Sequence, residues 1–317
     1  MSASSSDSAA GWAIDVRGMT KRFDTRTVVN QIDLRVREGQ IYGFLGPNGS
    51  GKTTTIRMLC GLLNPDAANG TCLGYDIIRE AALIKLQTGY MTQRFSFYED
   101  LTIEENLDFV ARLYNLQPRR QKVEEALERI GLGARRKQLA GALSGGWKQR
   151  LALAACVMHE PKLLLLDEPT AGVDPQARRE FWDAIHRLSD EGVTVLVSTH
   201  YMDEAERCHR IVYIMDGHIL ADGTIPELLA HAGLHTLRVR GSATSALRST
   251  LERLPGIEQV APFGETLHVT GTDRAMLLAA VAPFRNDPQL LWSEGDTTLE
   301  DVFIHLMQRR RAGTDGH

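Results

Sequence analysis

Between residues 12 and 223, short runs of β-branched and aliphatic residues alternate with longer stretches that repeat apolar residues at helical spacing. This alternation is typical of an α/β domain built on a largely parallel sheet. The pattern predicts strands at residues 28–36, 41–45, 88–92, 163–167, 193–199, 211–215 and 219–221. It predicts helices at residues 52–60, 103–113, 121–130, 146–158 and 176–190. Asp216 and Gly217 separate the last two strands and favour a tight hairpin turn.

The pattern changes after residue 229. It then predicts a strand at 235–240, a helix at 245–254, a hairpin-like pair around Gly264, a helix at 274–282, a strand at 289–293 and a helix at 299–309. This order, β-α-β-β-α-β with a final helix, predicts a small ferredoxin-like α+β domain. We therefore expect a disordered serine-rich tail at 1–10, an α/β domain at 11–230, the accessory domain at 231–310 and a polar tail at 311–317.

The composition is that of an ordinary globular protein, with 43% hydrophobic residues, 24% charged residues and a formal net charge of −4. This charge balance argues against a nucleic-acid partner. The sequence contains no run of about 18 apolar residues, the length that a membrane-spanning helix requires. The first ten residues also lack the features of a secretory signal. We expect a cytoplasmic chain that does not itself cross a membrane.

The strongest motif is GPNGSGKT at residues 46–53, which matches the phosphate-binding loop G-x-x-x-x-G-K-[ST] between a predicted strand and a predicted helix. Its glycines allow backbone N–H groups to surround phosphate oxygens, and the helix N-terminus adds partial positive charge. Lys52 is expected to reach the β- and γ-phosphates of ATP, and Thr53 to bind Mg²⁺. The nucleotide-binding residues predicted here are Gly46, Asn48, Gly49, Ser50, Gly51, Lys52, Thr53 and Thr54.

A second motif consists of four leucines at 163–166 followed by Asp167 and Glu168. A carboxylate at the C-terminal end of a buried strand can hold Mg²⁺, which is the role predicted for Asp167. Glu168 is then placed to act as general base or to orient the attacking water. An isolated Asp-Glu pair would more simply cap a helix, but the phosphate-binding loop upstream favours the catalytic interpretation.

The segment LSGGWKQR at 143–150 resembles the signature motif of ABC ATPases. The resemblance implies a homodimer in which the signature loop of one subunit and the phosphate-binding loop of the other enclose ATP. Ser144 and the amides of Gly145 and Gly146, at the start of a helix, suit a second anion-binding site. This sequence has Trp147 where the family usually places Gln or another less bulky residue, and we expect Trp147 to pack at the helix start.

The same resemblance assigns roles to four further residues. It implies that Phe23 stacks on adenine and that Gln93 contacts Mg²⁺ and water and senses the transmembrane partner. It also implies that Asp174 crosses the dimer interface and that His200 contacts the γ-phosphate. Each of these residues alone has an ordinary structural explanation. For example, Asp174 precedes Pro175 and also suits a helix N-cap.

Family members that act on ribosomes carry two ATP modules, and those that act in DNA repair carry a long coiled-coil insertion. This chain shows neither feature, since only about ninety residues separate Gly51 from Ser144. The combined presence of Lys52, Asp167, Glu168 and His200 argues for ATP turnover rather than nucleotide binding alone.

The segments at 97–102 and 298–303 resemble those of ATPases that serve ABC-2 type exporters, such as drug-resistance and multidrug-efflux ATPases. The resemblance implies a peripheral subunit at the cytoplasmic face of the inner membrane, which powers efflux of a drug-like or lipophilic substrate through separate multi-span permease subunits. Residues 94–102 are the expected permease contact. The alternatives are the ATPase of a lipid-linked glycan or envelope exporter and, less favoured, a soluble ABC ATPase acting on ribosomes or DNA.

Overall fold

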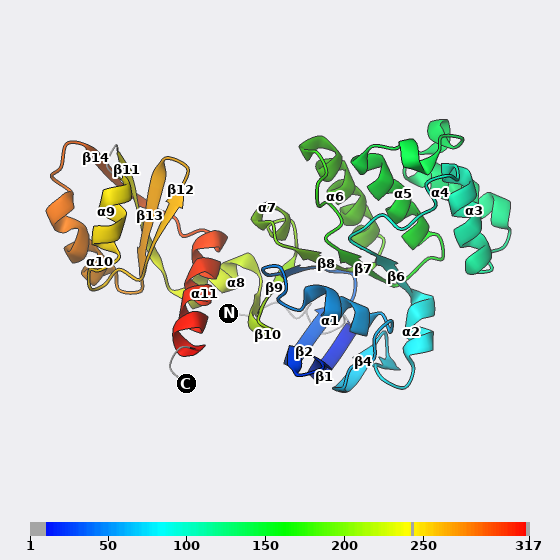
Figure 1. Cartoon of the computed structure of the whole chain (residues 1–317), viewed down its shortest axis with the longest axis horizontal. Helices are drawn as coiled ribbons and strands as arrows, with labels where there is room; N and C mark the ends of the chain where they lie inside the picture. The colour runs from blue at the N-terminus through cyan, green and yellow to red at the C-terminus, as the bar shows by residue number, and fades with distance from the viewer. Residues whose placement is uncertain (1–10, 242–243, 315–317) are drawn as a thin grey trace, which may run out of the picture. The chain divides into compact units, whose positions relative to one another are not determined.

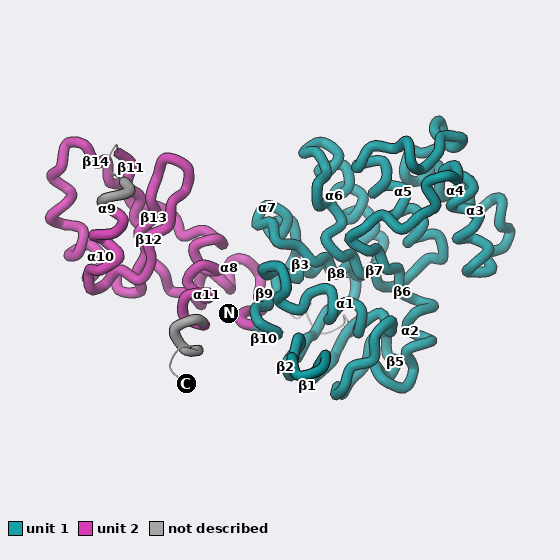
Figure 2. Tube along the Cα trace, viewed as in Figure 1, with its two compact units in different colours: residues 1–219 teal, residues 220–317 magenta. Residues whose placement is uncertain are grey.

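The computed structural model describes residues 11–241 and 244–314. The chain forms two compact units, residues 1–219 and 220–317 (Figure 2). Helix α8 (Ile225–Ala232) contacts α11 (Leu299–Thr314), and both helices belong to the second unit. The second unit therefore begins before α8, whereas the domain boundary expected at residue 230 falls within this helix.

The central sheet has six strands in the order β10-β9-β3-β8-β7-β6 (Figure 1), and all of them except β10, which continues past residue 219, lie wholly within the first unit. In chain order these strands are β3 (Ile41–Leu45), β6 (Thr88–Met91), β7 (Leu163–Asp167), β8 (Thr194–Thr199), β9 (Arg210–Met215) and β10 (His218–Gly223). The pairs β6–β7, β7–β8, β3–β8 and β3–β9 are parallel. Every residue of β3, β7 and β8 is buried, because both faces of a parallel sheet are covered. The α/β prediction is confirmed.

A second, antiparallel sheet has the order β2-β1-β4-β5. Its strands are β1 (Trp12–Phe23), β2 (Arg26–Arg37), β4 (Ala67–Cys72) and β5 (Tyr75–Asp76). One hydrophobic cluster joins this sheet to α1 (Lys52–Leu59) and to the central sheet, through residues such as Val16, Ile56 and Leu165. The sequence pattern did not predict β1, β4 or α2 (Ala81–Gln87).

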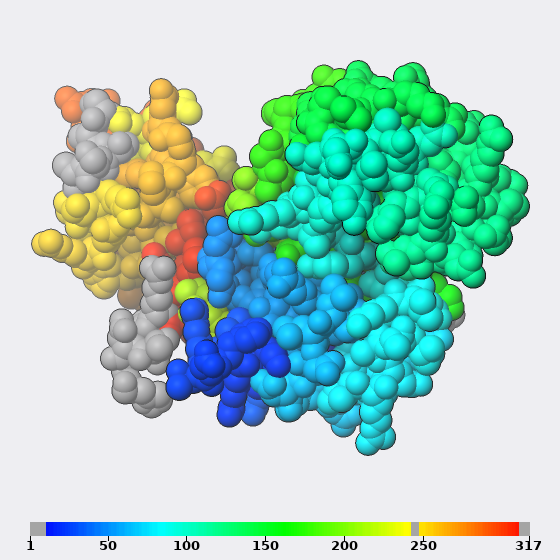
Figure 3. Space-filling model, turned by 45° about the vertical axis from the view of Figure 1, so that its right-hand side comes forward, coloured from blue at the N-terminus to red at the C-terminus, as the bar shows by residue number. Residues whose placement is uncertain are grey.

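The signature helix α5 (Gly145–Val157) is buried on two sides. Leu153 packs with the central sheet and α6 (Pro175–Asp190), whereas Leu151 packs with α3 (Ile103–Leu113) and α4 (Arg119–Arg129). Residues 151–157 of α5 are apolar around the whole circumference of the helix, a pattern that is normal for a buried helix. In the space-filling view, the cyan-to-green segments of this helical subdomain lie above the blue-to-cyan segments that include the antiparallel sheet (Figure 3).

The second unit contains a four-stranded antiparallel sheet in the order β12-β13-β11-β14. Its remaining elements are β11 (His235–Gly241), α9 (Thr244–Leu251), β12 (Gln259–Phe263), β13 (Thr266–Gly271), α10 (Arg274–Val281) and β14 (Leu290–Gly295). This strand order is that of the predicted ferredoxin-like arrangement. Among the residues described in both units, no helix has the length and apolar character needed to span a bilayer.

Candidate active site

The phosphate-binding loop connects β3 to α1 at the carboxyl edge of the central sheet, where ligands of open α/β sheets usually bind. Two of its glycines are needed for close backbone approach. A Cβ atom on Gly46 would lie 2.1 Å from the carbonyl oxygen of Ile214. Gly51 has a φ of 107°, and a Cβ there would lie 2.8 Å from the carbonyl oxygen of Val28. The loop can therefore adopt this path only with glycine at both positions.

Lys52 is buried at the start of α1 and holds the loop in shape. Its Nζ atom donates hydrogen bonds to the carbonyl oxygens of Gly46, at 2.8 Å, and Pro47, at 3.1 Å. The same atom lies 3.5 Å from Oε1 of Glu168. Burial lowers the pKa of Lys52, while the charge of Glu168 opposes this shift. A buried ammonium group at the base of the loop suits an anionic phosphate.

Asp167 ends β7 and accepts two hydrogen bonds on Oδ1. Thr53 Oγ1 donates one at 3.1 Å, and Ser198 Oγ donates the other at 2.7 Å. Asp167 and Ser198 face each other in the register of β7 and β8. This pairing brings together the two residues predicted to bind Mg²⁺, Thr53 and Asp167, and adds Ser198, which the sequence reasoning missed.

Glu168 lies at the centre of the predicted catalytic residues. Gln93 Nε2 donates a hydrogen bond to its Oε2 atom at 3.0 Å, and His200 Nδ1 lies 3.4 Å from the same atom. The backbone N–H of Glu168 donates to Ser198 Oγ at 3.0 Å. Glu168 has a φ of 47°, a left-handed conformation that costs free energy in a non-glycine residue and is common at active sites. The structure thus brings Glu168, Gln93, His200 and Lys52 together.

A cavity of about 300 Å³ opens at this point. Its lining consists of Val28, Asn48, Gly49, Gly51, Lys52, Thr53, Thr54, Gln93 and Glu168. Phe23, the residue expected to stack on adenine, is 46% exposed near the β1–β2 turn and is outside this lining. Val28 forms an apolar part of the cavity wall and was not predicted as a site residue. The sequence indicated only that it begins a strand.

The residues of this cavity fit a nucleotide phosphate chain with Mg²⁺. The hydroxyl of Ser50 is buried in the loop and has no hydrogen-bond partner among the described residues, so a donor is available there. Thr53 and Asp167 offer the hard oxygen ligands that Mg²⁺ prefers, and Gln93 adds an amide oxygen. The loop amides and Lys52 complete an environment suited to anions.

The signature loop opens into a different cavity, of about 250 Å³. This cavity is lined by Ser144, Gly146 and Asp174 together with Trp147, Arg150, Gln176, Ala177 and Glu180, and it shares no residue with the first. Asp174 caps α6, accepting hydrogen bonds from the backbone N–H groups of Gln176 and Ala177. Gly145 begins α5 beside Ser144. Within one chain, the predicted nucleotide-binding residues therefore form two separate groups.

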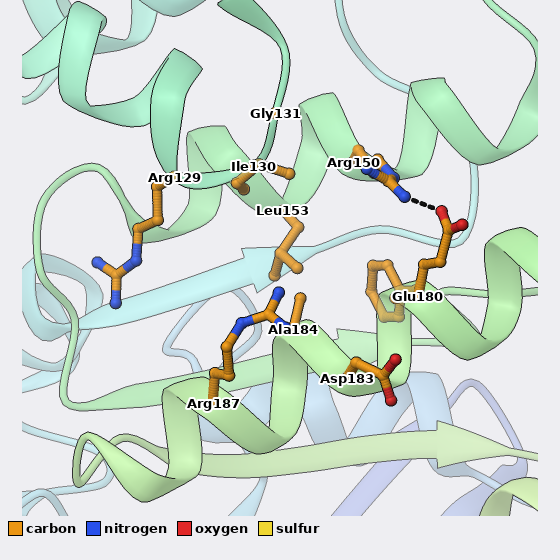
Figure 4. A pocket seen from close by; sticks show the side chains of 10 residues that line it. Arg129, Ile130, Gly131, Arg150, Leu153, Glu180, Asp183, Ala184 and Arg187 are labelled. Atoms are coloured by element: carbon orange, nitrogen blue, oxygen red, sulfur yellow. Dashed lines mark hydrogen bonds and ion pairs between the residues drawn. The ribbon is translucent and has the colours of Figure 1, made fainter.

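Trp147 packs at the start of α5, between two guanidinium groups. Those of Arg135 and Arg150 lie 4.5 and 4.8 Å from the centroid of its ring. Arg150 also forms an ion pair with Glu180 of α6. Both residues line one side of a further cavity of about 290 Å³, whose lining comes from α5, α6 and residues 129–131 (Figure 4). These contacts fix the signature helix against α6.

Comparisons with known proteins agree with this geometry. Residues 29–171 match the family model described as ABC transporter. The chain is 44% identical over 221 residues to the probable multidrug ABC transporter ATP-binding protein YbhF of Escherichia coli, which covers 69% of this chain but only 38% of YbhF. It is 37% identical to the daunorubicin/doxorubicin resistance ATP-binding protein DrrA of Streptomyces peucetius, over 93% of this chain and 92% of DrrA.

The chain is also 37% identical to the Nod factor export ATP-binding protein I of Ralstonia nicotianae, over 93% of this chain and 94% of that protein. Among solved structures, it resembles an ATP-binding cassette determined as a dimer in a post-hydrolysis state with ADP and Pi. That match has 25% identity and a TM-score of 0.61, and it covers 66% of this chain and 97% of the cassette. The chain therefore belongs to the family of ABC transporter ATP-binding proteins.

Proposed function

We propose that this chain is the ATP-hydrolysing subunit of an ABC-2 type exporter. The observation that carries the proposal is the position of Glu168, which contacts Gln93, Lys52 and His200 at the mouth of a phosphate-binding loop. A carboxylate in this position can accept a proton from an attacking water, or orient that water, beside the phosphate chain.

The other residues of the site position and stabilise charge. Lys52 offers positive charge to the phosphates. His200 lies close to the Glu168 carboxylate, where it can help to orient the attacking water and the phosphate. Thr53, Asp167 and Gln93 would hold Mg²⁺. When bound, this ion supplies positive charge that neutralises the phosphate oxygens. Ser198 keeps Asp167 and the backbone of Glu168 in register.

The separation of the two groups of nucleotide-binding residues supports a homodimer. Ser144, Gly146 and Asp174 line a cavity that is separate from the one containing Lys52, which supports the proposal that a second copy supplies the signature loop to each site. ATP bound between the subunits would then favour the closed dimer, because only the closed form provides both sets of contacts. The dimeric cassette that resembles this chain supports the dimer.

Coupling to a membrane permease is the proposed output. Tyr98 and Phe109 form an edge-to-face aromatic pair at the helical subdomain, and both rings are exposed. We assign residues 94–102 and this pair as the contact with multi-span permease subunits, which would hold the chain at the cytoplasmic face of the inner membrane. The names of YbhF and DrrA support a drug-like or lipophilic substrate, and all three relatives favour transport over a role on ribosomes or DNA.

The catalytic proposal is tested with Glu168→Gln, which keeps the side-chain shape but removes the proton acceptor. We expect the variant to bind ATP, to lose turnover by roughly 100-fold or more and to accumulate as a dimer with ATP. Glu160→Gln is the matched control, because Glu160 also has a positive φ, of 54°, but forms a surface ion pair with Lys122. Undiminished turnover in Glu168→Gln would contradict the assignment.

The transporter proposal is tested by purifying the tagged chain from detergent-solubilised membranes and identifying bound proteins by mass spectrometry. Recovery of a multi-span permease, with ATP turnover by the complex, is the expected result. Recovery of ribosomal or DNA-repair proteins instead would contradict the exporter function while leaving the ATPase assignment intact.

A further inference from the structure

Glu204 is a buried carboxylate close to the active site that does not line its cavity. It lies on the short helix α7 (Met202–Ala205) and is only 1% exposed. Removing an ionised carboxylate from water is costly unless the group is paired and hydrogen-bonded. Its partners should therefore show which parts of the structure depend on it.

Those partners come from three different segments. Thr199, in the last position of β8, donates a hydrogen bond from Oγ1 to Oε2 of Glu204 at 2.7 Å. Thr170, in the loop after β7, donates from Oγ1 to Oε1. Arg178 of α6 supplies positive charge, with its Nε atom 3.5 Å from Oε1. Both threonines are 1% exposed, so water does not compete for these contacts.

The two threonines are neighbours in sequence of the catalytic residues. Thr199 immediately precedes His200, and Thr170 follows Glu168 by two positions. The backbone between Glu168 and Asp174 turns tightly, with Ala171 N donating to Glu168 O and Val173 N donating to Thr170 O, both at 3.2 Å. Glu204 therefore joins the strand end that carries His200 to the loop that carries Glu168 and ends at Asp174.

We propose that Glu204 is a positioning residue for ATP hydrolysis, which holds His200 in place beside Glu168. The inference rests on the proposed function of this site. Glu204 is not among the residues that line the phosphate-binding cavity, so its loss should affect the chemical step more than ATP binding. The loop that contains Thr170 ends at Asp174. A change in the position of Asp174 could therefore shift His200 through the hydrogen bonds of Thr170 and Thr199 to Glu204.

The first test is Glu204→Gln, which preserves size but cannot accept hydrogen bonds on both terminal atoms. We expect kcat to fall by about 10- to 100-fold, because small displacements of catalytic groups have effects of this size, while the KM for ATP stays within about twofold. Glu206→Gln is the matched control, since Glu206 is exposed at the end of the same helix. Its kcat should equal that of the wild type.

The second test concerns the hydroxyl of Thr199, which donates to Glu204 Oε2 at 2.7 Å and accepts from the backbone N–H of Tyr201 at 3.0 Å. Thr199→Val removes the hydroxyl at similar volume and should reduce kcat, whereas Thr199→Ser keeps the hydroxyl and should restore it. The double variant Glu204→Gln/Thr199→Val should lose less kcat than the product of the two single losses, because both changes disturb the hydrogen bond between Thr199 and Glu204. If Glu204→Gln fails to fold, the Thr199 pair carries the test.

Wild-type kcat in Glu204→Gln, a loss expressed mainly in KM, or equal kcat in Thr199→Val and Thr199→Ser would overturn the inference. Absence of ATP turnover in the wild-type chain with its permease would instead refute the proposed function. The two failures are thus distinguishable.

Discussion

Ser198→Ala should separate the positioning of Asp167 from general stability. Ser198 is fully buried on β8, and its hydroxyl donates to Asp167 Oδ1 at 2.7 Å while accepting from the backbone N–H of Glu168 at 3.0 Å. The substitution removes one oxygen atom and leaves the side chain otherwise unchanged. After it, Asp167 keeps Thr53 as a hydrogen-bond donor, and Glu168 N keeps the Ser198 carbonyl oxygen at 3.2 Å.

The magnitude follows from the charge of the acceptor. A hydrogen bond to a charged group contributes about 1.5–3 kcal/mol to stability, and one between neutral groups about 1 kcal/mol. Ser189→Ala is the matched control, because Ser189 is also buried and donates to a neutral acceptor, the carbonyl oxygen of Gly39, at 2.8 Å. At roughly 2–4 °C per kcal/mol for a domain of this size, Tm should fall about twice as far in Ser198→Ala as in Ser189→Ala.

The functional effect should be larger than the stability effect. Loss of an outer-sphere partner of a metal ligand typically costs about 10- to 100-fold in metal affinity or activity. We therefore expect Ser198→Ala, measured by steady-state ATP turnover at increasing Mg²⁺, to need roughly 10-fold more Mg²⁺ for half-maximal activity. Ser189→Ala should match the wild type. A wild-type Mg²⁺ dependence in Ser198→Ala, or an equal Tm loss in both variants, would refute the reasoning.

Two further predictions concern the loop and the pH dependence of stability. Gly46→Ala would place a Cβ atom 2.1 Å from the carbonyl oxygen of Ile214. Calorimetry should therefore show weakened ATP binding, and Tm should fall by the equivalent of about 1–3 kcal/mol. Gly133→Ala is the control, because no atom lies within 4 Å of a Cβ at that position, and it should change neither quantity. Burial lowers the pKa of His159 and of His305 in the folded chain. Below the ordinary histidine pKa of about 6.5, the unfolded chain therefore binds more protons than the folded chain does. The contribution of these neutral histidines to the free energy of unfolding should be fully present above that pH and should be lost as the pH falls below it. An unfolding temperature that stays constant or rises when the pH is lowered from 7.5 to 5.5 would contradict this.

The secondary structure could be predicted best for elements that are buried on all sides, because burial requires apolar residues along their whole length. Strands β3 and β7 and the second half of helix α5, residues 151–157, are almost entirely apolar because nearly all of their surface is covered, and each element was predicted within one or two residues of its observed bounds. Strand β1 was missed because Gly18 has a positive φ, of 59°, and shifts in register interrupt its alternation. Strand β4, with the sequence AANGTC, contains few residues that favour strands, so its pairing with β1 decides its conformation.

In the candidate site, residues that belong to contiguous motifs could be predicted, whereas residues whose partners come from distant segments could not. Residues 46–53, Asp167 and Glu168 could be predicted because they belong to short contiguous motifs. Ser198 and Glu204 lie in an ordinary strand and an ordinary helical turn, and only the register of β8 against β7 and the burial of α7 give them partners. Short-range sequence pattern contains no information about such contacts, because each joins segments brought together by the sheet. Residues that contact the nucleotide should therefore be the predictable part of an ABC ATPase site, and the residues that orient them should require the structure.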